Sequence, residues 1–161
     1  MIIGILKERA PERRVALTPE TAKSFIVSGS VILFESGAGA EACLRDADYR
    51  NEGVRISTRN EVLAGSDCIL SISGPAAGEF ETWGNNRILI GHLNVTGNAA
   101  LLDKLIFYKT TAFSLDLLPR TSIAQSMDIL SSMATVSGYK AVLDAANHLY
   151  RFFPMFMSAS G

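Results

Sequence analysis

The sequence predicts an α/β fold built on an open, mostly parallel sheet of the flavodoxin-like or Rossmann-like kind, flanked by helices. Short apolar runs alternate with segments of helical pattern along most of the 161 residues. These segments are long enough for crossover helices, which is typical of βαβ units in a parallel sheet. The chain then closes with a stretch rich in small apolar residues, which predicts a long C-terminal helix.

The first half of the chain carries the clearest local signals. Ile2–Leu6 is an apolar run that predicts a strand, and the polar loop Lys7–Arg14 follows it. Thr18–Glu20 begins a helix, because threonine can cap it, proline suits its first position and glutamate favours the positive end of its dipole. Gly29 ends that helix. The next expected elements are a strand at Val31–Phe34, a short helix at Asp46–Tyr49, a strand at Val54–Ile56 and a short helix at Arg59–Ala64.

The second half continues the same alternation. The expected elements are strands at Cys68–Ile72, Arg87–Leu93 and Thr111–Leu115, a helix at Asn98–Phe107, and one long helix from Ser122 to about Phe152. We interpret residues 1–161 as a single domain, with a sheet core at 1–118 and a loop with a long connecting helix at 119–161.

Composition excludes several classes of function. The net charge of −1 and the pI near 6.1 do not favour nucleic-acid binding. Cys43 and Cys68 lack metal-ligand or disulfide-scaffold spacing, so we expect no metal and a reducing cytoplasm. No apolar run reaches the roughly 20 residues that span a bilayer. Charged residues make up only 19% of the chain against about 25% in typical domains, which predicts a surface made for a partner.

A polar cluster stands at the start of the predicted long helix. Gln125, Asp128 and Ser132 lie at i, i+3 and i+7, which would place them on one helix face, with Ser131 beside them. Arg120 lies just upstream. An amide, a carboxylate and a guanidinium can together bind a carboxamide and steady a ribose. The same residues could instead form a capping network with an ordinary ion pair, and the spacing alone leaves both interpretations open.

Two glycine-rich or basic loops are weaker candidates. Gly37–Ala42 matches GxGxxA after a strand, but the long helix and later acidic residue of a nucleotide fingerprint do not follow, which favours a plain glycine turn. Arg14 follows the carboxyl end of the first strand, where open α/β sheets bind ligands, and could hold a carboxylate through both of its terminal nitrogens. A solvated loop with surface ion pairs is the alternative.

The segment Pro119–Ala134 resembles the nicotinamide-facing loop of proton-translocating NAD(P) transhydrogenase alpha subunits. Segments shared with the related alanine dehydrogenases are also present, at Arg14–Pro19 and Glu35–Gly39, so the resemblance covers essentially the whole chain. It implies that Arg120, Gln125 and Asp128 are the catalytic and cofactor-binding residues that place the nicotinamide, and that Ser131 completes their polar shell.

The resemblance also implies a reaction and partners. NAD would bind here, NADP would bind on a beta subunit, and hydride transfer between them would be coupled to proton movement through a membrane domain. The chain would form a homodimer at the cytoplasmic face of the inner membrane. Family members continue past the position of Gly161 into a Rossmann domain with GxGxxG, which this sequence lacks. We therefore expect only a portion of the NAD site here and an inactive isolated chain.

Two alternatives remain open from the sequence. An alanine-dehydrogenase-type oxidoreductase fragment would use Arg14 to hold the substrate carboxylate. By the resemblance, however, Ser73 and Asn94 stand where alanine dehydrogenases have a pyruvate-binding lysine and a histidine, and losing that lysine removes a carbonyl-polarising group. The other alternative is a non-catalytic dimerisation or regulatory module.

Overall fold

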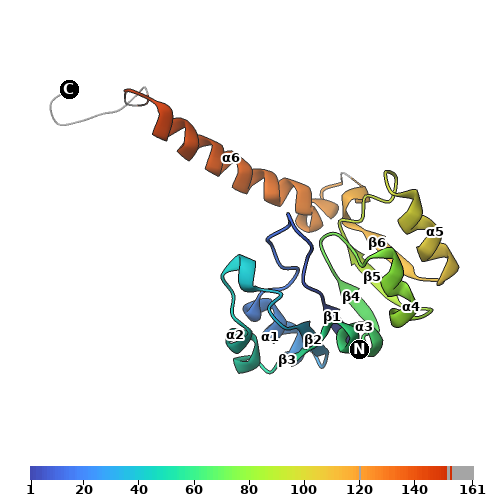
Figure 1. Ribbon diagram of the computed structural model, residues 1–161. Helices are drawn as coiled ribbons and strands as arrows, with labels where there is room; N and C mark the ends of the chain where they lie inside the picture. The colour runs from blue at the N-terminus through green and yellow to red at the C-terminus, as the bar shows by residue number, and fades with distance from the viewer. Residues whose placement is uncertain (120, 152, 154–161) are drawn as a thin grey trace. The chain divides into compact units, whose positions relative to one another are not determined.

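The computed structural model describes residues 1–119, 121–151 and 153 and divides the chain into two compact units, Met1–Leu117 and Leu118–Gly161 (Figure 1). The first unit contains a six-stranded sheet in the order β3-β2-β1-β4-β5-β6, and every strand pair is parallel. Its strands are β1 (Ile2–Ile5), β2 (Val31–Glu35), β3 (Arg55–Ser57), β4 (Cys68–Leu70), β5 (Ile88–Gly91) and β6 (Thr111–Ser114). The predicted α/β class with an open parallel sheet is confirmed.

Helices cover the sheet on both faces, as a parallel sheet requires. The α-helices of the first unit are α1 (Pro19–Val27), α2 (Asp46–Asn51), α3 (Arg59–Gly65), α4 (Phe80–Trp83) and α5 (Ala99–Phe107). Short 3₁₀ helices are η1 (Ala40–Ala42), η2 (Ala77–Glu79) and η3 (Leu115–Leu117). The sequence did not predict η2 and α4, because the segment Ala77–Trp83 is too short for a helical period to be visible.

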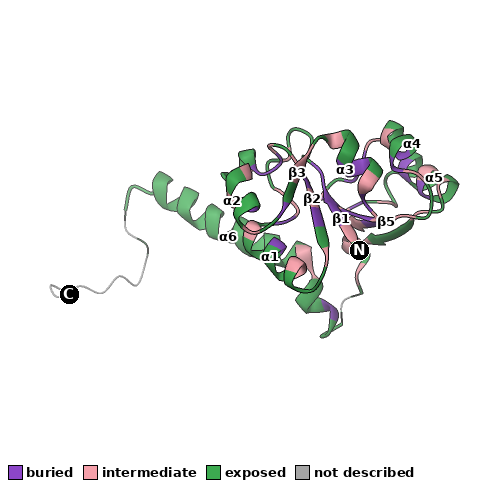
Figure 2. Cartoon of the chain, turned by 90° about the horizontal axis from the view of Figure 1, so that it is seen from below, coloured by how far each residue is buried: buried purple, intermediate pink, exposed green. Residues whose placement is uncertain are grey.

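Two core clusters result from the alternation of side chains along the strands. One cluster joins α3, α4 and α5 to Ile69 and Leu89, which are in register on one face. The other joins α1 and α2 to Ile3 and Ile32, which are in register on the opposite face. Figure 2 shows the buried residues concentrated in the strands and on the helix sides that face them. Cys68, the first residue of β4, is 1% exposed and lies in the core.

The first helix follows its sequence signals closely. Thr18 is the N-cap, and its side chain accepts a hydrogen bond from the backbone N–H of Thr21 at 3.3 Å. Pro19 is the first helical residue, where the missing N–H costs nothing. Gly29 follows the helix with φ of 86°, in the left-handed region that favours glycine.

Gly91 is required where β5 passes the segment after β4. A Cβ atom at this position would lie 2.0 Å from the carbonyl oxygen of Ser71. We expect Gly91→Ala to lower the free energy of unfolding by about 3 kcal/mol, because the clash is with backbone that cannot move aside. Urea unfolding followed by fluorescence measures this loss. Gly78→Ala is the matched control, because nothing lies within 4 Å of its Cβ position; equal effects of the two substitutions would contradict the clash.

The second unit differs from the prediction at its start. A 3₁₀ helix, η4 (Ala124–Met127), comes first, and α6 (Ile129–His148) begins only after it. Asp128 between them has φ of −77° and ψ of 97°, an extended conformation that interrupts any helix. The single helix predicted from Ser122 is therefore wrong over its first two turns. Aspartate causes this break because its side chain bonds the following backbone N–H groups better outside a helix than inside one. Phe152, the predicted end, lies outside the described residues.

Candidate functional site

The candidate site of the second unit is organised by Asp128. Its Oδ1 accepts hydrogen bonds from the backbone N–H groups of Leu130 at 2.9 Å and Ser131 at 3.2 Å. Its Oδ2 accepts the hydroxyl of Ser131 at 2.6 Å. Asp128 is thus the N-cap of α6, and the positive end of the helix dipole adds to the stabilisation of its charge.

Gln125 belongs to η4 and not to the helix that bears Ser131. Its backbone N–H donates to the carbonyl of Thr121 at 3.0 Å, and its own carbonyl accepts the N–H of Asp128 at 3.3 Å. The structure therefore corrects the expected i, i+3, i+7 face, because η4 and the extended Asp128 lie between Gln125 and the helix that bears Ser131 and Ser132. Gln125 is exposed, and within the described residues of the chain its side-chain amide makes no hydrogen bond.

The structure connects Asp128 directly to Ser131 through the helix cap. Arg120, the guanidinium that the sequence adds to this cluster, lies outside the described residues. The capping interpretation and the ligand interpretation are compatible, because the cap holds the Asp128 carboxylate and Ser131 hydroxyl in place while Gln125 presents a solvent-facing amide.

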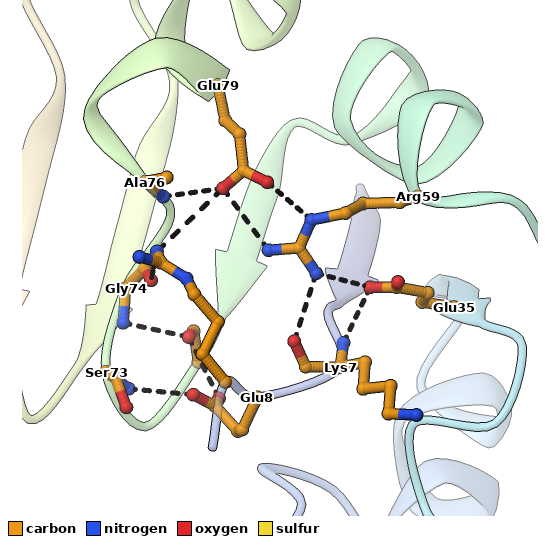
Figure 3. A network of polar contacts seen from close by, with 10 residues as sticks. Lys7, Glu8, Glu35, Arg59, Ser73, Gly74, Ala76 and Glu79 are labelled. Atoms are coloured by element: carbon orange, nitrogen blue, oxygen red, sulfur yellow. Dashed lines mark hydrogen bonds and ion pairs between the residues drawn. The ribbon is translucent and has the colours of Figure 1, made fainter. Parts of the chain in front are cut away.

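A second polar cluster lies at the carboxyl edge of the sheet in the first unit, and Figure 3 shows its centre. The guanidinium of Arg59 donates to Glu35 at 2.6 Å and, through two nitrogens, to Glu79 at 2.5 and 3.2 Å. Its side chain is 25% exposed. Arg59 also donates to the carbonyl of Lys7 at 3.0 Å, so one side chain joins the end of β2 to the segments that follow β1 and β4.

Local structure places Arg59 at the first position of α3. Thr58 caps that helix in a capping box, in which Glu61 bonds the backbone N–H of Thr58 at 2.8 Å. Burial raises the pKa of Glu79, but the hydrogen bonds from Arg59 and from the N–H of Ala76 lower it by more than burial raises it. The pKa of Glu79 therefore lies below its ordinary value. Glu79 is therefore ionised at neutral pH.

A third carboxylate, that of Glu8, binds the segment after β4. It accepts the hydroxyl of Ser71 at 2.9 Å and the backbone N–H groups of Ile72 at 2.6 Å and Ser73 at 3.1 Å. Sequence reasoning missed the roles of Glu8 and Arg59. The available signal was that several charged residues follow the predicted strands, whose carboxyl ends meet at one edge of a parallel sheet.

Arg14, the residue assigned to a substrate carboxylate in the alternative interpretation, is bound within its own loop. Its Nε and Nη2 donate to the two carboxylate oxygens of Glu12 at 2.8 and 2.6 Å. An external carboxylate would have to displace Glu12 before Arg14 could bind it bidentately. Of the two interpretations of this loop, the structure shows the ion pair.

This ion pair predicts a specific acid sensitivity. The hydrogen bond from the Arg14 side chain lowers the pKa of Glu12 from 4.5 to about 2. Because the folded-state pKa is depressed, the stabilisation is complete above the unfolded value of 4.5 and is lost as the pH falls towards 2. We expect Glu12→Gln to flatten the fall of melting temperature over this range, while Asp103→Asn, at an exposed position in the middle of α5, leaves it unchanged. Parallel curves for the wild type and Glu12→Gln would contradict the assignment.

By the resemblance, Ser73 and Asn94 depart from alanine dehydrogenases, and these two residues occupy different settings. Ser73 lines an open pocket of about 420 Å³ together with Arg9, Ala10, Pro11 and Glu12. Asn94 follows β5 with φ of 46°, and its backbone N–H donates to Asp116 at 3.4 Å. Ser73 and Asn94 belong to the first unit, and Gln125–Ser131 belongs to the second.

The described residues offer neither a metal cluster nor a membrane span. Within residues 1–119, 121–151 and 153, no three His, Cys, Asp or Glu side chains are grouped so as to hold a metal ion. The helices of the same ranges include none with the length and hydropathy needed to cross a membrane.

Comparison with known proteins identifies the family. An NAD(P) transhydrogenase subunit alpha protein of Rhodospirillum rubrum is 38% identical over all of this chain and 44% of that protein. The alanine dehydrogenase of Methanococcus maripaludis is 28% identical over 92% of the chain and 40% of that protein. The chain thus spans less than half the length of these relatives.

A solved structure and a family model agree with these relatives. The crystal structure of transhydrogenase from Sinorhizobium meliloti superposes with a TM-score of 0.87 at 35% identity, over 100% of this chain and 48% of that one. The model of the alanine dehydrogenase/PNT N-terminal domain matches residues 4–137. Because this match covers most of the sequence, the chain belongs to the alanine dehydrogenase/PNT N-terminal domain family.

Proposed function

We propose that this chain belongs to the NAD(H)-binding component of a proton-translocating transhydrogenase, in which hydride passes between NAD(H) and NADP(H). The observation that carries the proposal is the arrangement around Asp128: a capped carboxylate, a hydroxyl bonded to it and an exposed amide from Gln125. The sequence similarity of this chain to a transhydrogenase alpha subunit supports the proposal. On this proposal, the NADP-binding partner is a beta subunit, and the complex includes a membrane domain.

The residues present are suited to a nicotinamide carboxamide. The amide of Gln125 offers both a donor and an acceptor, as the carboxamide does. Ser131 and Asp128 are fixed by the helix cap, so they need not be ordered when a ligand binds. NAD supplies the hydride chemistry when bound. The residues of this chain hold and orient it, with Arg120 as a further member of the shell, and no protein acid or base is required.

The assembly follows from the same proposal. The protein would act as a homodimer at the cytoplasmic face of the inner membrane, in a complex with the beta subunit. The name of the Rhodospirillum rubrum relative, an alpha subunit, supports a complex of more than one kind of subunit. NAD would bind across this region and the portion of the alpha subunit that follows it in the relatives.

An alanine dehydrogenase activity is less well supported. The guanidinium of Arg14 is already paired with Glu12. At the pocket, Ser73 has a neutral hydroxyl where, by the resemblance, alanine dehydrogenases have a lysine. A neutral hydroxyl stabilises a developing oxyanion less than an ammonium group does.

The proposal is tested by a fusion enzyme. Residues 1–161 replace the matching region of the Rhodospirillum rubrum alpha subunit, and membranes that contain the other subunits are assayed for hydride transfer from NADH to NADP⁺. We expect transfer within about tenfold of the parent enzyme, since the chain is 38% identical to the region that it replaces. Alanine-dependent reduction of NAD⁺ without transfer between nucleotides would favour the dehydrogenase instead. Absence of both activities in a folded, assembled fusion would contradict an enzymatic role.

A further inference from the structure

The carboxylate of Glu8 accepts hydrogen bonds from a group of donors that resembles an anion-binding site. The sheet order places β1 beside β4, where the chain changes direction across the sheet. Open α/β sheets bind ligands outside the carboxyl ends of the strands at such a point. Here the donors are the hydroxyl of Ser71 and the backbone N–H groups of Ile72 and Ser73, and all three point to one carboxylate.

We propose that this is a carboxylate-binding site whose ligand is built into the chain, and that Glu8 keeps it closed to external carboxylates. Both oxygens of Glu8 are used: Oε1 by Ser71 and Ile72, and Oε2 by Ser73. Figure 3 shows Glu8 pointing at Ser73 from the segment that follows β1. The inference goes beyond the proposed function and does not depend on it.

The donors are held in place by bonds that do not involve Glu8. The N–H of Ser71 donates to the carbonyl of Ile90 at 3.1 Å, and the carbonyl of Ile72 accepts the N–H of His92 at 3.1 Å, so β5 fixes this backbone. The hydroxyl oxygen of Ser71 accepts the N–H of Gly74 at 2.9 Å, which leaves its proton to point at Glu8. Ser71 is only 4% exposed. The site would therefore keep its shape without Glu8.

Removing the Glu8 side chain should leave three converging donors without an acceptor. Ser71 is buried and Ile72 is half-buried, where a donor without a partner is costly, while Ser73 is exposed. An anion that binds all three donors gains charge-assisted hydrogen bonds. The space left by a glutamate side chain has room for a small monocarboxylate such as acetate. The neighbouring pocket at Ser73 gives such a ligand a way in from solvent.

The test compares the full chain with Glu8→Ala and with Glu81→Ala, a control at an exposed glutamate of α4. Each protein is titrated with sodium acetate to about 100 mM against sodium chloride of equal ionic strength, since a ligand that binds only the folded state raises its melting temperature. We expect acetate to raise the melting temperature of Glu8→Ala by several degrees and to shift its Ile72 and Ser73 amide resonances saturably. The wild type and Glu81→Ala should show neither change.

Two results would overturn the proposal. The first concerns Glu8→Ala that is folded. If acetate changes neither its melting temperature nor its Ile72 and Ser73 amide resonances, or changes them only as it does in the wild type, the site does not bind carboxylates. The second comes from the wild type and needs no variant to fold. Its Ile72 and Ser73 amides should be protected from hydrogen exchange and show scalar coupling across the hydrogen bonds to the Glu8 carboxylate carbon. Rapid exchange without coupling would mean that Glu8 does not occupy the donors.

Discussion

Replacing Asp128 with alanine is expected to lower hydride transfer by the fusion enzyme about 100-fold, the cost of misplacing a reacting group by roughly 1 Å. The carboxylate fixes the hydroxyl of Ser131 at 2.6 Å and two N–H groups at the start of α6. Without it, the helix start can fray and the hydroxyl loses its orientation. Steady-state transfer from NADH to NADP⁺ measures the loss, and the rate constant should fall more than the affinity for NADH.

Two further variants separate the role of Asp128 as a helix cap from the role of its negative charge. Asp128→Asn keeps a good N-cap acceptor but removes the negative charge, so an intermediate loss would show that both contribute. Asp144→Ala removes an aspartate of the same helix whose carboxylate pairs with Lys140 at 3.0 Å on an exposed face, and it should change the rate less than about twofold. If Asp128→Ala transferred hydride as fast as Asp144→Ala, Asp128 would have no role in the site.

Replacing Arg59 with alanine is expected to lower the free energy of unfolding by about 3 kcal/mol, since removing one partner of a largely buried ion pair leaves charges uncompensated. Glu35 and Glu79 have side chains only 14% and 22% exposed, and both depend on this guanidinium. Urea unfolding at neutral pH measures the loss. Arg59→Lys should recover only some of it, because an ammonium cannot reproduce the paired contacts of Arg59 with Glu79.

A control on β3 separates the loss of a positive charge in general from its loss at the position of Arg59. Arg55→Ala removes an exposed arginine at the start of the edge strand β3 and should change stability by less than about 0.5 kcal/mol. Adding Glu79→Gln to Arg59→Ala should restore some stability, because it removes one of the unpaired carboxylates. Equal losses from Arg55→Ala and Arg59→Ala would contradict the central role of Arg59.

Local signals were sufficient for most of the fold. Thr18 and Pro19 determine the start of α1 through contacts within four residues, and the apolar runs at β1 and β2 are short enough to favour strands over helices. Asp128 shows where such reasoning fails. The surrounding apolar residues favour one continuous helix, yet a single side chain bonding two backbone N–H groups moves the helix start to Ile129. The residues of that site could be named from sequence, but not the backbone that carries them.

The carboxyl-edge cluster could not be predicted because it depends on strand order. Glu35 and Arg59 are 24 residues apart, and Glu8 and Ser73 are 65 apart. They meet only because β1 lies between β2 and β4. Charged residues after strands signal an edge, but pairing them requires the order of the strands in the sheet.

The central claim is that the Gln125–Ser131 segment faces the nicotinamide, and its most direct test is NMR of the fusion enzyme's alpha subunit with ¹⁵N-labelled glutamine and bound NAD⁺. We predict nuclear Overhauser contacts between the nicotinamide ring protons and the Gln125 side-chain amide, lost in Gln125→Ala. Contacts from the nicotinamide only to the Arg9–Glu12 and Ser73 pocket, with none to Gln125, would contradict the account.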